Sequence, residues 1–137
     1  MNSIDLFFSI RPESHQSFRV GRGGIKYKPK KIVNYQKEII SLCKKQLPDY
    51  WVIIERGTPI ICEYVHYSYS YLKSIPIKKR NGLIPKVTKP DLQDNLNKAL
   101  FDALEGIIYE QDQNIVEVRS MKKFYSNMNY IKLKFIY

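Results

Sequence analysis

Apolar and polar positions along the first half of the chain predict a strand, a helix and a second strand. Residues 3–10 are rich in strand-forming side chains and end before Pro12, which indicates a first strand. Residues 31–47 place apolar side chains at helical spacing and are followed at once by Pro48, so this stretch predicts a helix. Residues 58–72 are dense in β-branched and aromatic residues, which predicts a long strand.

The second half of the chain predicts another helix followed by two strands. Residues 91–105 carry leucine and alanine on one helical face, and Gly106 is suited to the position just after the helix. A turn and a strand then precede a final strand over residues 128–137, with Ser126-Asn127 as the hairpin turn. The order β-α-β-α-β-β predicts an α/β fold, more closely an α+β two-layer sandwich in which a mixed sheet carries two main helices.

The length of 137 residues predicts a single domain that spans residues 1–137. No apolar run is long enough to cross a bilayer, and the N-terminal stretch lacks the basic region of a signal peptide. We therefore expect no membrane partner and a cytoplasmic protein. Cys43 and Cys62 lack metal-site spacing, so we expect two small buried side chains.

Basic residues are concentrated in two stretches that contain no acid. The chain has a net charge of +10, yet no Asp or Glu lies between Glu13 and Glu38 or between Glu63 and Asp91. Each side chain that neutralises a phosphate releases condensed counterions, so such stretches are suited to DNA. The alternative is that they are solvated loops. The candidates for DNA binding are Arg19, Arg22, Lys26, Lys28, Lys30, Lys31, Lys78, Lys79, Arg80, Lys86 and Lys89.

One face of the second predicted helix is acidic, although the chain is basic. At about 100° per residue, a single stripe of that helix contains Asp91, Asp94, Lys98, Asp102 and Glu105. In a purely structural role, the first two acids would cap the helix or face its positive end, and Asp94 would pair with Lys98. The alternative is a site for a hard cation, because converging carboxylates repel one another unless a cation lies between them. Two further acids, at positions 110 and 112, are near enough in sequence to fold back beside the helix.

The stretch "KPDLQDNLNKALFDALEGIIYEQDQNIVE" resembles the signature of the RusA family of Holliday junction resolvases. That signature runs roughly K-P-D-x-D-N-L-x-K, then D-A-L, a small turn and D-D-x-Q-I. The upstream stretch "RVGRGGIKYKPKKIVNYQKEI" is similar to the glycine-rich basic segment of the same family. The resemblance implies a RusA-like fold and a bacterial or phage-encoded endodeoxyribonuclease that cuts four-way DNA junctions with Mg²⁺, or with Mn²⁺ as the alternative.

Carried over residue by residue, the resemblance implies that Asp91, Asp94 and Asp112 bind the metal. The family usually separates its first two acids by one residue, whereas two residues stand between Asp91 and Asp94 here. Anchoring on "DNL-K" makes Asp94 the surer ligand. The paired aspartates that precede the last strands of the family correspond here to Gln111-Asp112, so Asp112 supplies that ligand, and Glu110 is a substitute.

Lys98 is the lysine that the resemblance implies is needed for cleavage. Phosphodiester hydrolysis requires an activated water and stabilisation of the charge that grows on the phosphoryl and leaving oxygens, which carboxylate-bound Mg²⁺ can provide. A lysine one turn beyond Asp94 can place a fixed positive charge near the phosphate. Asp102 lies on the same side, where it would orient Lys98 or only contribute to packing.

Two other functions agree with the same residues. One is a basic protein that binds branched DNA through a decayed nuclease site, which the altered acid spacing and Gln111 suggest. The other is a metal nuclease acting on other branched DNA or on RNA. If the chain is a resolvase, paired cuts require two sites, and a homodimer would supply them. Its interface is expected around Tyr67 to Tyr71 or along the final strand.

Overall fold

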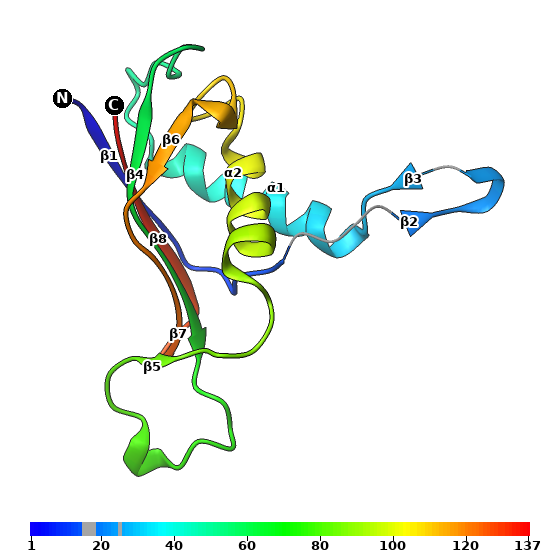
Figure 1. Cartoon of the computed structure of the whole chain (residues 1–137), viewed down its shortest axis with the longest axis vertical. Helices are drawn as coiled ribbons and strands as arrows, with labels where there is room; N and C mark the ends of the chain where they lie inside the picture. The colour runs from blue at the N-terminus through cyan, green and yellow to red at the C-terminus, as the bar shows by residue number, and fades with distance from the viewer. Residues whose placement is uncertain (15–18, 25) are drawn as a thin grey trace.

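The computed structural model of the chain describes residues 1–14, 19–24 and 26–137. Its two helices are α1 (Lys30–Gln46) and α2 (Lys98–Leu104), and a mixed sheet of six strands packs beside them (Figure 1). The strands of this sheet are β1 (Ser3–Phe8), β4 (Ile60–Ser70), β5 (Ile84–Pro85), β6 (Ile115–Val118), β7 (Met121–Ser126) and β8 (Tyr130–Ile136). The predicted α+β class is confirmed.

The sheet is built around β4. Its strands run in the order β1, β8, β4, β7, β5, and β6 also pairs with β4. Strand β8 is antiparallel to both β1 and β4, whereas β6 and β7 are parallel to β4. Both edges of the final strand are therefore occupied within the chain. Only its outward side chains are left to contact a partner.

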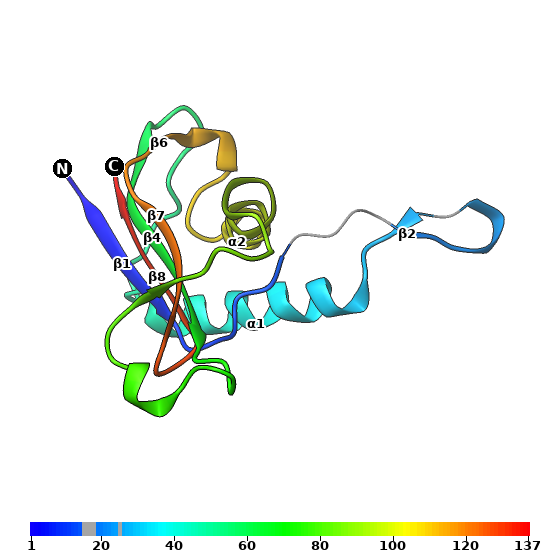
Figure 2. The same cartoon turned by 60° about the horizontal axis from the view of Figure 1, so that its bottom comes forward.

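The hydrophobic core lies between the sheet and the two helices, which cover the same face of the sheet (Figures 1 and 2). Helix α1 buries Ile32, Ile39 and Cys43 at helical spacing, as an amphipathic helix on a sheet must. From β4, Tyr67 and Tyr69 are 0% and 3% exposed and join this core. The alternating tyrosines thus serve core packing and do not form an exposed interface. Both cysteines are free and buried, as predicted.

The second helix begins differently from the regular helix that its sequence predicts. Its first turns, η3 (Leu92–Asn97), are π-helical, and the Leu96 N–H donates to the Asp91 carbonyl five residues back. A π-turn holds one more residue than an α-turn. Buried side chains fix this segment, since the Asn97 amide accepts from the Tyr67 hydroxyl at 2.6 Å and donates to the Met121 sulfur.

The two basic stretches adopt different structures. The predicted loop 11–31 contains a short hairpin of β2 (Arg19–Val20) and β3 (Lys26–Tyr27), which Figures 1 and 2 place beyond the start of α1 and away from the sheet. The segment 71–90 is held together by its own contacts. There the Arg80 guanidinium donates to three carbonyls of the loop, and the Tyr71 hydroxyl bonds the Gly82 carbonyl.

The segment after α1 fastens the turn that follows α2. The Trp51 indole N–H donates to the Ile107 carbonyl at 3.0 Å, and the Ile54 N–H donates to the Ile108 carbonyl at 2.9 Å. Gly106, with φ of 85°, follows the end of α2 in the conformation that favours glycine, as predicted. Among the described helices, none combines the length and the apolar character that a membrane span requires.

Candidate metal centre and DNA-binding surface

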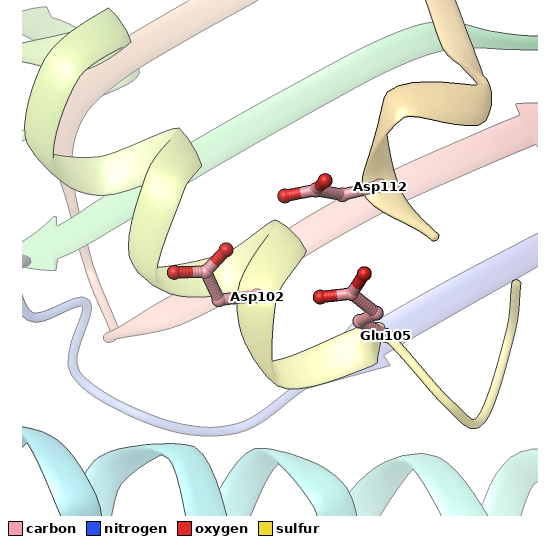
Figure 3. Close-up of side chains that lie close together, drawn as sticks. All are labelled: Asp102, Glu105 and Asp112. Atoms are coloured by element: carbon pink, nitrogen blue, oxygen red, sulfur yellow. The ribbon is translucent and has the colours of Figure 1, made fainter. Parts of the chain in front are cut away.

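Three carboxylates from two elements meet beside the end of α2. One carboxylate oxygen from each of Asp102, Glu105 and Asp112 lies within 4.8 Å of the other two. Figure 3 shows the first two on the last turns of α2 and Asp112 across from them, with all three side chains turned toward the same space. Two ligands on opposite sides of Mg²⁺ stand about 4.2 Å apart, so a small closing movement would bring this group to ligand spacing.

Local structure explains why these acids converge. Asp102 and Glu105 are three residues apart and share one face of α2. Asp112 opens the short turn η4 (Asp112–Asn114), whose buried Asn114 donates its side-chain N–H to the Glu55 carbonyl at 2.8 Å. That bond fixes the turn against the segment after α1, and so fixes the position of Asp112 opposite α2.

The electrostatics of this cluster favour a cation. Burial raises the pKa of Asp102 above its ordinary value, and the hydrogen bond and charge of Asp112 raise it further, while Lys28 and Lys98 act in the opposite sense. Asp102 and Glu105 also lie at the C-terminal end of α2, where the helix dipole is negative. Repulsion among hard oxygen donors at a negative helix end is the condition that a bound divalent cation relieves.

Lys98 and Asp112 line the same cavity. It measures about 340 Å³, and its walls include Gln93, Asn97 and Phe101 from the second helix, with residues of β6 and β7 opposite. The exposed Lys98 side chain and the half-buried Asp112 thus border one space large enough for a phosphate group. A carboxylate, which is able to bind a metal ion, and a cationic side chain, which is able to bind an oxyanion, therefore line the same cavity.

Comparison with known proteins identifies the family. The family described as Endodeoxyribonuclease RusA matches residues 9–135. The chain belongs to the RusA family. A shorter match, 41% identical over 59 residues, is to the uncharacterized protein YqaN of Bacillus subtilis (strain 168); it spans 43% of this chain and 40% of that protein.

The two acids that open the RusA signature lie apart from the acidic cluster. Asp91 and Asp94 are both exposed, and neither belongs to the group formed by Asp102, Glu105 and Asp112. Asp91 stands at the N-cap position without a side-chain capping bond. Among the described residues, no ion pair joins Asp94 to Lys98. The capping bond and the ion pair that the sequence allowed for these two acids are therefore not observed, whereas Asp94 does lie in the first turn of the helical segment, at its positive end.

This chain has one residue more than the RusA signature between its first two acids, and that additional residue lies in the π-helical turn. The signature allows one residue between its first two acids, and here Leu92 and Gln93 stand between them at the start of η3. Because a π-turn accommodates one additional residue, the chain after it keeps the register that buries Leu96 and Asn97. Gln93 is turned to the cavity that Lys98 and Asp112 line.

Two acids near the cluster differ from the sequence-based expectation. The Glu110 carboxylate accepts from the Arg56 backbone N–H at 2.9 Å and lies outside the cluster, although Glu110 was a substitute ligand. Glu105 was not selected as a ligand, yet it belongs to the cluster. Its place on the acidic stripe, one turn after Asp102, was the available signal.

Some of the basic candidates for DNA binding form hydrogen bonds or ion pairs within the chain, and others are exposed without an acidic partner among the described residues. Lys28 donates to Gln36 at 3.0 Å, Lys31 pairs with Glu13, Arg80 holds its own loop, and Lys86 donates to the Tyr125 hydroxyl. Exposed side chains that have no acidic partner among the described residues are those of Arg22, Lys30, Lys78, Lys79 and Lys89. The structure does not describe the side chains of Arg19 and Lys26.

Lys28 links the first basic stretch to the acidic cluster. Its ammonium group donates to the side-chain oxygen of Gln36, and the side-chain N–H of Gln36 donates to the Ala99 carbonyl of α2 at 3.1 Å. This buried glutamine fixes α1 to α2 and holds a positive charge near Asp102. The charges of Lys28 and Lys98 therefore both act on Asp102 of the cluster.

Proposed function

We propose that this chain is a Mg²⁺-dependent endodeoxyribonuclease that resolves four-way DNA junctions by paired phosphodiester hydrolysis. The observation that carries the proposal is the shared cavity of Lys98 and Asp112 beside Asp102, in a chain of net charge +10 that matches the RusA family. Mn²⁺ is expected to substitute for Mg²⁺, because both accept carboxylate oxygens.

Asp112 is the metal ligand common to the signature and the observed cluster. The signature supports Asp94 and, less surely because of the altered spacing, Asp91 as further ligands, and proximity to Asp112 supports Asp102 and Glu105. When bound, the metal ion would activate a water and stabilise charge on the phosphoryl oxygens. Hard carboxylate oxygens and mutual repulsion at the cluster fit such an ion.

Lys98 acts on the phosphate and not on the metal in this proposal. Lys98 borders the cavity, and its ammonium group would hold a phosphoryl oxygen there as negative charge develops. Asp102, one helical turn later, holds the Lys98 side chain toward the cavity through opposite charge. The exposed basic side chains on the loop 71–90 and at the start of α1 bind the flanking phosphates.

Paired cuts require two such sites, so we propose a homodimer with twofold symmetry. The described residues contain a single cluster of this kind. A molecular mass twice that of the 16.2 kDa chain, measured by light scattering with and without junction DNA, is the expected result. A monomeric mass in both conditions would contradict the dimer.

One assay tests the function. A labelled four-way junction and a linear duplex of matched sequence are incubated with the protein in Mg²⁺ and then in EDTA. Junction cutting that requires Mg²⁺ and spares the duplex is expected. Binding without cutting would identify a decayed nuclease site, and equal cutting of junction, duplex or RNA would identify a nuclease without junction preference.

The exposed pair Lys78 and Lys79 provides a test of the DNA surface. Replacing both with glutamate should weaken junction and duplex binding alike and reduce the salt dependence of binding, because phosphate contacts are lost. Arg80 is left unchanged because its guanidinium holds the loop. Binding curves over a range of salt concentrations give the slope, and an unchanged slope would remove this loop from the DNA surface.

A further inference from the structure

Neither helix covers the face of the sheet opposite α1 and α2, although Phe124 on that face is only 4% exposed. Both helices lie on the other side in Figures 1 and 2, and side chains alternate across each strand. Tyr67 faces the helices, so its neighbours on β4 face outward. The open sheet face, formed by the outward side chains of β1, β4, β7 and β8, carries the rings Phe7, Tyr64, His66, Phe124 and Tyr130.

These rings form a continuous series of contacts. Phe7 stacks on Tyr130 with centroids 5.3 Å apart and planes inclined by 25°. Tyr130 meets Phe124 edge-on at 6.1 Å, and Phe124 meets His66 at the same distance. His66 then contacts Tyr64 at 5.2 Å. Phe7 is 44% exposed, so the stacked pair at the β1 side presents an aromatic surface to solvent.

Lysines alternate with the rings on the same face. Strand register places Lys132 of β8 between Phe7 of β1 and His66 of β4, and places Lys122 of β7 on the other side of His66. The Lys132 ammonium lies 5.7 Å from the centre of the Tyr64 ring. Burial and the charges of Lys122 and Lys132 lower the pKa of His66, so the imidazole adds no positive charge at neutral pH.

The positive charge of the open sheet face favours a negatively charged partner. A third lysine, Lys134, lies across from Tyr64, whereas Asp5 is the acid in that row and accepts from the Tyr64 hydroxyl at 3.0 Å. A second copy of the face would oppose these lysines with the same charges. A partner with a regular negative charge and flat apolar groups would satisfy both the lysines and the rings.

We propose that the open sheet face binds single-stranded DNA, with bases stacked on Phe7 and Tyr130 and phosphates held by Lys122 and Lys132. Unpaired bases have free π-faces, whereas paired bases in a duplex cover theirs, so the rings select unpaired strands. This contact lies on the side of the sheet away from the acidic cluster and does not depend on the proposed nuclease activity.

Binding of two probes by titration calorimetry tests the proposal. One probe is oligothymidine, and the other is an abasic oligonucleotide of the same length and charge. The wild-type protein should bind oligothymidine about tenfold tighter or more, because stacking contributes only to that probe. Equal affinity for the two probes would overturn the proposal.

The double variant Phe7→Ala with Tyr130→Ala should lose the preference for oligothymidine and keep its affinity for the abasic probe. Tyr130→Phe, which keeps the ring, should retain the preference. The matched control is Tyr50→Ala, which removes an 84% exposed tyrosine from another part of the surface and should change neither affinity. A preference that persists in the folded double variant would contradict the assignment.

A charge variant covers the case in which the double variant does not fold. Lys122→Gln with Lys132→Gln alters two exposed side chains and should reduce the salt slope for both probes by about 1.4, at about 0.7 per lost phosphate contact. An unchanged slope would overturn the proposal. A second result would also overturn it: a molecular mass half that of the wild type, in the ring variant or in the charge variant, with unchanged binding of both probes. That result would assign the face to self-association. Junction cutting is expected to persist in all these variants, which separates this test from that of the nuclease.

Discussion

The two ends of the helical segment from Leu92 to Leu104 carry carboxylates in opposite surroundings. At the π-helical start, Asp91 and Asp94 are exposed, and neither makes the capping or pairing contact available to it. At the α-helical end, Asp102 is half-buried, and burial together with Asp112 raises its pKa. Lys98 stands between the two ends and borders the cavity.

The contrast shows that the sequence signature and the local electrostatics mark different carboxylates along one helical segment. The signature selects Asp91 and Asp94 by their place beside "DNL-K". Proximity to Asp112 at a negative helix end identifies Asp102 and Glu105. Variants at each end therefore show which carboxylates the chemistry requires.

The largest effects are expected from Asp94, at the π-helical start, and from Asp112, in the acidic cluster. Asp94→Asn should abolish junction cutting, because a carboxylate ligand is lost, and Asp112→Asn should do the same. Junction binding should be unchanged or tighter, since one negative charge is removed near phosphate. Asp49→Asn, at an exposed position after α1, is the control. A folded Asp94→Asn protein that cuts at the wild-type rate would assign the metal to the α-helical end alone.

Lys98→Ala tests the residue that lies between the two ends of the helical segment. The loss of a positive charge on the developing oxyanion should lower kcat by about 10²–10³-fold and leave DNA affinity nearly unchanged. Metal binding should persist, measured as an increase in Tm on addition of Mg²⁺. Loss of that Tm increase, with cutting retained, would show that Lys98 supports the carboxylates instead of the phosphate.

Asp91→Asn should have a smaller effect, because the additional residue in η3 separates Asp91 further from Asp94 than the signature does. We expect about a tenfold reduction in cutting that higher Mg²⁺ or Mn²⁺ concentrations restore. Cutting rates over a metal titration measure this. A defect as large as that of Asp94→Asn, without rescue, would place Asp91 among the required ligands.

The smallest expected effect is on the stability of the α-helical end. Since the folded state raises the pKa of Asp102, its contribution to stability is present below the ordinary pKa and is lost as pH rises through the raised value. At neutral pH in EDTA, Asp102→Asn should therefore raise Tm by about 1–4 °C. Added Mg²⁺ should raise Tm of the wild type more than that of the variant. An unchanged Tm in EDTA, with equal gains in Mg²⁺, would show that Asp102 is neither repelled nor a ligand.

Elements with a strong apolar period could be predicted from the sequence. The spacing of Ile32, Ile39 and Cys43 indicated α1, and the β-branched and aromatic run around Tyr67 indicated β4. These signals are local, because burial of one face fixes the period. The π-turn at residues 92–97 could not be predicted in this way, since it depends on Asn97 reaching Tyr67 and Met121 across the core.

The candidate site could be predicted only in part. Asp112 and Lys98 were expected together, and they line one cavity. Glu105 was missed because nothing in the sequence fixes the turn that brings Asp112 beside it; that turn depends on the bond from Asn114 to Glu55. The ligand roles of Asp91 and Asp94 are still predictions from the signature.

Trp51 gives this molecule an intrinsic optical probe. It is the only tryptophan of the chain, its indole N–H is bonded to Ile107, and its ring packs against Tyr137 at 6.0 Å. Residues 107–112 connect that bond directly to Asp112. Binding of a cation at Asp112 would therefore change the wavelength or the intensity of Trp51 fluorescence. Metal occupancy can then be followed in the unlabelled protein during a single turnover.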